Sequence, residues 1–137
     1  MKYLGLDLGT KTLGLAMSDK LGILSSPYKV LKYENINNLI DELLDIIKKE
    51  DIDELVLGLP KNMNNSLGYA SERSMNFKKL LEEKCDKKIH LVDERLSTVE
   101  AEKYLISTDT SRMKRKKIID AYAASIILET YLNKRRD

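Results

Sequence analysis

Hydrophobic and polar positions alternate at the start of the chain and later follow a helical period. Leucines occupy every second position of residues 3–8, which predicts a strand, and residues 9–11 predict a tight turn. Residues 12–18 alternate in the same way, with large apolar residues on one face and small residues on the other. A third strand is predicted over 22–32, where Pro27 indicates an edge strand or a bulge.

Helical spacing of apolar residues begins after this meander. It predicts a helix over 36–47, capped by Asn35 or Asn37. The remaining predicted elements are a strand over 54–59, a polar loop over 61–68, a helix over 70–84 with Met75, Leu80 and Leu81 available for burial, a strand over 89–93, a short helix over 98–106 and a helix over 116–132. This order predicts one α/β domain over residues 1–137, with helices flanking a mixed five-stranded sheet.

The composition excludes several kinds of catalytic and metal-binding site, and it says less about the fold. The 137 residues include one cysteine and one histidine, Cys85 and His90, so an intramolecular disulfide, a cysteine-based zinc site and serine–histidine catalysis are all disfavoured. No apolar run reaches the roughly 18–20 residues of a membrane span, and an acid at position 7 argues against a signal peptide. We therefore expect a cytoplasmic protein with no membrane partner, whose catalysis rests on carboxylates.

The formal net charge of +2 conceals two charged regions of opposite sign. Residues 34–54 carry eight acids and two lysines, whereas residues 112–136 carry eight bases and two acids. The densest basic run, residues 112–117, has five bases in six residues. Such asymmetry suggests a polyanionic partner for the basic end, although a solvated helix start is the simpler explanation of the run by itself.

Asp7 lies near the end of the first predicted strand, on the face that carries Gly5 and Gly9 rather than the leucines. Glycines on that face leave room for a ligand to approach the backbone. An aspartate that simply forms the turn is the alternative interpretation.

Asp93 and Glu94 end the fifth predicted strand. Because adjacent residues of a strand point to opposite faces, only one of them is expected on the face of Asp7. A surface ion pair with Arg95 is the alternative.

Asp120 lies on an apolar face of the last predicted helix, where Ala123, Ala124 and Ile127 are its neighbours one and two turns on. An ionised acid there is unfavourable unless it is paired, capped or bound to a cation. Stabilisation of Asp120 by the helix dipole in the first turn explains the pattern less well, because helical residues precede Asp120. A bound metal is the better explanation.

Acids from two strand ends and a helix would form a set of hard oxygen ligands suited to Mg²⁺ or Mn²⁺. Two such ions, roughly 3.5–4 Å apart, would relieve repulsion among the carboxylates and activate water for attack on a phosphodiester. The basic run would then hold the phosphate backbone beside the cut. The candidates for phosphate binding are Lys11, Arg95, Arg112, Lys114, Arg115, Lys116 and Lys117.

Four segments resemble the YqgF/RuvX family, small bacterial proteins with an RNase H-like fold. They are residues 6–16 (LDLGTKTLGLA), 56–63 (VLGLPKNM), 92–101 (VDERLSTVEA) and 116–124 (KKIIDAYAA). The resemblance covers nearly the whole chain, and the DERLST sequence is its most specific part. The chain departs from the family pattern at Asn64-Asn65 and at Thr12, which affects a loop and a turn.

The resemblance implies a metal-dependent nuclease that processes the 5′ end of precursor 16S ribosomal RNA, with a Holliday junction resolvase as the alternative. It places the acidic ligands at Asp7, at Asp93 or Glu94, and at Asp120. It favours Asp93, because this fold usually keeps its second ligand at a strand end, although the alternation of side chains leaves that choice open.

Two other classes of function compete with the nuclease. Residues 7–10 also resemble the first phosphate loop of actin-like and sugar-kinase-like ATPases, but those proteins need two such domains. The other is a nucleic-acid-binding module without turnover, which the presence of all three acidic positions disfavours. We expect precursor rRNA or branched DNA as the partner, and a monomer or a homodimer.

Overall fold

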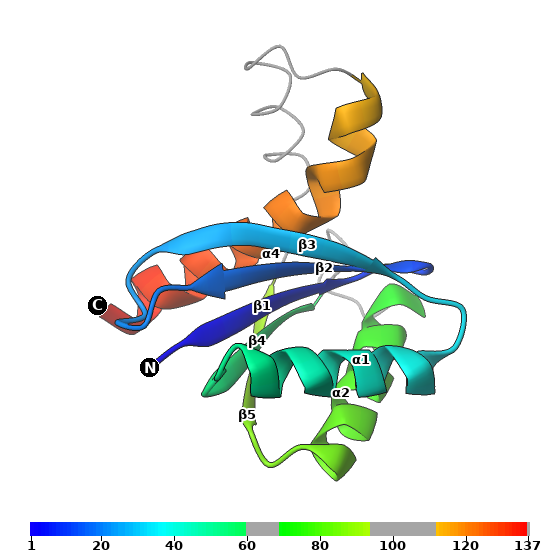
Figure 1. Ribbon diagram of the computed structural model, residues 1–137, viewed down its shortest axis with the longest axis horizontal. Coiled ribbons are helices and arrows are strands. Elements are labelled where there is room, and N and C mark those ends of the chain that lie inside the picture. The colour runs from blue at the N-terminus through cyan, green and yellow to red at the C-terminus, as the bar shows by residue number, and fades with distance from the viewer. Residues whose placement is uncertain (60–68, 94–111, 137) are drawn as a thin grey trace.

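A mixed five-stranded sheet organises the protein (Figure 1). The computed structural model describes residues 1–59, 69–93 and 112–136, and for residues 69–70, 112–118 and 136 the backbone alone. In chain order the elements are β1 (Tyr3–Leu8), β2 (Thr12–Ser18), β3 (Ser25–Lys32), α1 (Ile36–Lys49), β4 (Glu54–Leu59), α2 (Tyr69–Lys84), β5 (Lys88–Asp93) and α4 (Arg112–Arg136). The predicted loop over 61–68 and the predicted helix over 98–106 lie outside the described residues.

The strand order is β3-β2-β1-β4-β5. The first three strands form the antiparallel meander, while β4 and β5 run parallel to β1. Pro27 lies in the edge strand β3, opposite a shift of register between Leu15 and Ala16, so both predicted reasons for a proline there are met. The predicted α/β class and the five-stranded mixed sheet are confirmed.

Each face of the sheet has its own core. The leucines of the first two strands are buried against α1 and α2, with Leu4, Leu6, Leu13 and Leu15 fully inaccessible to solvent. The opposite face, which carries Tyr3, Ala16 and Val56, packs against α4. Figure 1 shows α1 and α2 on one side of the sheet and α4 on the other. The period-2 pattern of the sequence therefore predicts the faces correctly, because one-residue alternation separates the two cores.

Both ends of α1 are fixed by local hydrogen bonds. Asn35 caps the start, since its side chain accepts a hydrogen bond from the Asn37 backbone N–H at 2.8 Å. At the other end the Ile52 N–H donates to the Ile47 carbonyl at 3.0 Å, and the Asp51 N–H donates to the Lys48 carbonyl at 3.3 Å. These two bonds form a Schellman motif in which Asp51, at φ 56°, occupies the left-handed position that usually holds glycine.

Two details of the predicted helices differ from the structure. Met75, expected to be buried, is 41% exposed, and Phe77 is buried in its place alongside Leu81. Helix α4 begins at Arg112 rather than at residue 116, because lysine and arginine are good helix formers and the basic run continues the helix backwards. In Figure 1 the first turns of α4 extend beyond the sheet. None of the described helices has the length and apolar character that a membrane crossing requires.

Candidate active site

Two glycines allow α4 to lie directly on the sheet. A Cβ atom built on Gly14 would lie 2.1 Å from the carbonyl oxygen of Asp120, and one built on Gly5 would lie 2.9 Å from the carbonyl oxygen of Ala124. Contacts under 3.0 Å are not tolerated, so any side chain at Gly14 would push the helix backbone away. The glycines therefore bring the backbone at Asp120 into contact with β2.

Asp7 and Asp120 converge through this contact. Asp7 pairs with Gly14 in the antiparallel ladder of β1 and β2, and Gly14 is the residue on which the Asp120 backbone rests. By strand alternation Asp7 lies on the same face as Gly5, which packs against α4. Both carboxylates are half-buried. Two of the acids predicted from the sequence thus share one end of the interface between the sheet and α4.

Asp120 has a hydrogen-bond partner that sequence reasoning missed. The Thr12 hydroxyl donates to Asp120 Oδ2 at 2.6 Å, across 108 positions of the chain. This distance is typical of a hydroxyl donating to a carboxylate. The Thr12 hydroxyl is neutral, so it orients Asp120 without adding a counter-charge to the site. The available signal was the position of Thr12, which is two residues from Gly14 and therefore on the face that meets α4.

The turn between β1 and β2 is held from the side by Tyr33. The Gly9 N–H donates to the Thr12 carbonyl at 2.8 Å, while the Tyr33 hydroxyl donates to the Gly9 carbonyl. The Tyr33 N–H in turn donates to the Lys11 carbonyl at 3.0 Å. Burial raises the pKa of the Tyr33 phenol, an effect partly opposed by the nearby Arg73 guanidinium. The phenol thus stays protonated as a donor and fixes the turn that follows Asp7.

Asp93 lies at the end of β5, opposite Leu59 in the parallel ladder. Along β5, Ile89 packs against the leucine core and Val92 against the core under α4. Alternation therefore places Asp93 on the side of α1 and α2, whereas Asp7 lies on the side of α4. Glu94 and Arg95 lie outside the described residues, so the choice between Asp93 and Glu94 stays a prediction.

The predicted phosphate-binding residues also fall into two groups, those that the structure describes and those that it does not. Lys11 is exposed in the β1–β2 turn, beside the Thr12–Asp120 pair. The backbone of the run from Arg112 to Lys117 forms the first turns of α4, one to two turns before Asp120. The side chains of this run lie outside the description, so their phosphate contacts remain predictions.

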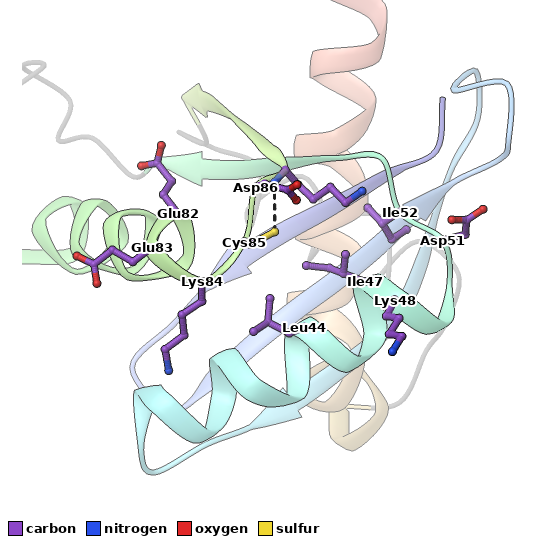
Figure 2. Close-up of a pocket in the computed structure, with 11 residues that line it drawn as sticks. Leu44, Ile47, Lys48, Asp51, Ile52, Glu82, Glu83, Lys84, Cys85 and Asp86 are labelled. Carbon is purple, nitrogen blue, oxygen red and sulfur yellow. Dashed lines mark hydrogen bonds between the residues drawn. The ribbon is translucent and has the colours of Figure 1, made fainter.

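One cavity borders the candidate site, and another lies away from it. One, of about 610 Å³, is lined by Lys11, Thr12, Lys32, Tyr33 and Glu34, and so borders the candidate site directly. Another, of about 660 Å³, lies between the C-terminal ends of α1 and α2, at the opposite end of the parallel strands (Figure 2). Figure 2 shows Leu44, Ile47 and Cys85 around that cavity. It contains none of the predicted site residues.

Carboxylate oxygens, the donors that Asp7 and Asp120 supply, are the preferred ligands of Mg²⁺ and Mn²⁺. Their position on one face, with small residues between them, fits such a cation. Within residues 1–59, 69–93 and 112–136, no three histidine, cysteine, aspartate or glutamate side chains form a metal-binding group. Among the predicted acidic ligands that the structure describes, Asp7 and Asp120 are the two that lie on the same face of the sheet.

Solved structures with the same architecture define the class of fold. RuvC of Thermus thermophilus in complex with a Holliday junction substrate superposes with a TM-score of 0.61 at 14% identity, covering 99% of this chain and 96% of that chain. The fowlpox virus resolvase in complex with Holliday junction DNA superposes with a TM-score of 0.58 at 14% identity, covering all of both chains. The fold is thus the RNase H-like fold of the resolvases.

Sequence comparison then identifies the family. Residues 1–134 match the model of the RuvX family, which is described as a Holliday junction resolvase, and this chain belongs to that family. Relatives from Staphylococcus aureus strains JH9 and USA300 are each 48% identical over 135 residues, or 96% of this chain and 95% of theirs. Both relatives carry the name "Putative pre-16S rRNA nuclease".

Proposed function

We propose that residues 1–137 form one divalent-metal-dependent endonuclease domain that trims precursor 16S rRNA in the cytoplasm. The observation that carries this proposal is the convergence of Asp7 and Asp120 through Gly14. The names of the Staphylococcus aureus relatives support the choice of substrate, and membership of the RuvX family supports nuclease chemistry.

Asp7, Asp120 and one acid at the end of β5 would hold Mg²⁺ or Mn²⁺. Asp93 lies on the opposite face of the sheet from Asp7, so both Asp93 and Glu94 stay candidates for that place. A bound divalent cation supplies a water of lowered pKa and stabilises negative charge on a phosphoryl oxygen. The protein orients the carboxylates through the Thr12 hydroxyl and the two glycine contacts.

Lysine and arginine side chains around the site would bind the substrate. Lys11 lies in the turn after Asp7, and the backbone of residues 112–117 leads into the turn that carries Asp120. Phosphate contacts from both sides would fix the strand across the carboxylates without reading its sequence. Arg95 follows the acidic pair and would add a further phosphate contact.

The test is a cleavage assay with Mn²⁺ on precursor 16S rRNA, a synthetic four-way DNA junction and a linear duplex. We expect rRNA cleavage that disappears with EDTA and falls at least about a hundredfold in Asp7→Asn and Asp120→Asn. Asp45→Asn, an exposed acid on α1, serves as the matched control and should cleave normally. Comparison of Asp93→Asn with Glu94→Gln identifies the third ligand, and undiminished cleavage by Asp120→Asn would disprove the proposal.

A Holliday junction resolvase is the second candidate, and the description of the RuvX family favours it. Symmetric cuts in two strands require two sites related by a two-fold axis, and therefore a homodimer. Preference for the four-way junction, with paired nicks and a dimeric mass in sedimentation, would establish this alternative over the rRNA nuclease.

A further inference from the structure

The outer edge of β5 borders a hollow of about 710 Å³ between α2 and α4. Among the described strands β5 is the last of the sheet, and β4 is its neighbour on the inner side. Asp93 lies at one end of the hollow, and Lys134 and Arg135 in the last turns of α4 contribute to its lining. This edge groove therefore follows β5 as far as Asp93, one of the two candidates for the third acidic ligand.

The edge groove is predominantly basic. Lys134 and Arg135 are exposed, and Lys78 contributes from α2, whereas Asp93 is the one acid among the described residues that line the groove. Lys78 also forms an ion pair with Glu82 at 3.0 Å, so the main positive charge comes from α4. The groove thus complements a polyanion rather than a basic or neutral partner.

One wall of the groove is rigid and aromatic. The Tyr131 ring stacks on His90 with centroids 4.6 Å apart and meets Tyr3 edge-on at 5.6 Å. His90 is held in turn by Glu54 at 2.7 Å, and the Arg135 guanidinium lies 5.1 Å from the centre of the Tyr3 ring. Because these contacts exist before any ligand arrives, binding there needs little side-chain ordering.

A second copy of the chain fits these observations less well. An edge strand can pair with a second copy of the chain, and lysines on an edge commonly prevent such pairing. Two copies joined along β5 would bring Lys134 and Arg135 of one copy near Lys134 and Arg135 of the other. The repulsion between these like charges disfavours such a dimer. A phosphate backbone would instead be attracted by them.

We propose that the edge groove binds the phosphate backbone of a single-stranded RNA segment next to the cleavage site, an inference that rests on the proposed nuclease function. Its volume lies within the roughly 300–1,000 Å³ of small-molecule sites, which suits one or two nucleotides rather than a duplex. Positive charge beside an aromatic wall is the combination that tracks single strands without sequence preference.

The test uses the full chain with Asp120→Asn, so that bound RNA is not cut. The probe is a fluorescein-labelled single-stranded RNA of twelve nucleotides, titrated at several salt concentrations. Lys134→Gln/Arg135→Gln should weaken binding about tenfold and lower the slope of log affinity against log salt by about 1.4, as expected for two lost single-strand phosphate contacts. Lys48→Gln/Lys49→Gln removes the same charge from the far end of α1 and should leave both quantities unchanged.

A second readout locates the bound strand. Addition of the RNA should shift the NMR amide signals of His90, Leu91 and Val92, and these shifts should vanish in the Lys134→Gln/Arg135→Gln protein. In the active enzyme the same double substitution should raise KM while leaving kcat unaltered.

The two proposals fail in distinguishable ways. If the wild type cleaves rRNA but the double variant binds and cleaves normally, the edge groove is not a substrate site. If RNA binding depends on the edge groove and no cleavage occurs, the groove proposal stands and the nuclease proposal fails. If the double substitution changes the sedimentation mass and not RNA affinity, the groove is an interface between copies and the inference is wrong.

Discussion

Substitution of Gly14 by alanine tests the geometry of the candidate site most directly. The added Cβ would lie 2.1 Å from the Asp120 carbonyl oxygen, whereas ordinary contacts begin at 3.4 Å. Helix α4 would have to move by roughly 1 Å, because the three nearest atoms, the carbonyl oxygen and carbon of Asp120 and the nitrogen of Ala121, all belong to its main chain. Overpacking of this kind costs about 2 kcal/mol, which corresponds to a fall in Tm of about 8 °C for a chain of this size.

The same displacement should affect catalysis more than stability. Movement of α4 shifts Asp120 relative to Asp7, and a misplacement of about 1 Å can lower a rate about a hundredfold. Gly5→Ala is the matched control, because its Cβ would also press on α4 but one turn away, at 2.9 Å from Ala124. We expect a smaller fall in both Tm and kcat for that variant.

Thermal unfolding followed by circular dichroism gives the change in stability, and single-turnover cleavage of precursor rRNA with Mn²⁺ gives the change in rate. Gly14→Ala with a wild-type Tm and wild-type cleavage would refute the close contact between β2 and α4. Equal losses in Gly14→Ala and Gly5→Ala would show that α4 packing in general, and not the position of Asp120, controls the rate.

Two further predictions concern single hydrogen bonds, those of Thr12 and Tyr33, and a third concerns the backbone conformation of Asp51. Thr12→Val removes the donor to Asp120 at nearly constant volume and should lower kcat about tenfold, while Thr12→Ser restores it; equal rates for all three proteins would exclude an orienting role. Tyr33→Phe removes the bond to the Gly9 carbonyl and should cost about 1 kcal/mol in urea unfolding. Because the pKa of Tyr33 is raised by burial, its neutral form stabilises the fold below the ordinary tyrosine pKa, and stability should fall as pH rises from about 10 upward, less steeply in the Phe variant. Asp51→Gly should raise stability by about 0.5–1 kcal/mol, since glycine adopts φ 56° without strain, and a lower midpoint in urea would contradict the Schellman assignment.

The sequence predicts the sheet well because its faces follow a strict two-residue period. Alternation in β1 and β2 separates leucines from glycine, alanine and aspartate, and the structure keeps that separation in its two cores. The buried face of helix α2 is harder to predict, because apolar residues are sparse in this helix and Met75 fits the helical spacing as well as Phe77 does. Which of them is buried depends on the position of α2 against the sheet, and this is a tertiary effect.

The candidate site shows the same division. Asp120 is visible in the sequence as an acid on an unfavourable apolar helix face, and Asp7 as an acid near a strand end with glycines on its face; neither signal needs three-dimensional information. The hydroxyl that orients Asp120 comes from a residue 108 positions away, and no local pattern predicts such a partner. No local pattern predicts the edge groove either, since its lining comes from α2, β5 and α4, which meet only in the folded chain.

The contacts of Gly5 and Gly14 with α4 also determine which changes the helix can accept. Both glycines meet the main chain of α4, at Ala124 and at Asp120, and these two points are one helical turn apart. Side-chain substitutions elsewhere on α4 leave the two points in place. A single residue inserted between positions 120 and 124 would rotate one point against the other by about 100°, so the helix could keep one of the two contacts but not both. The length of this turn is therefore more strictly constrained than its composition.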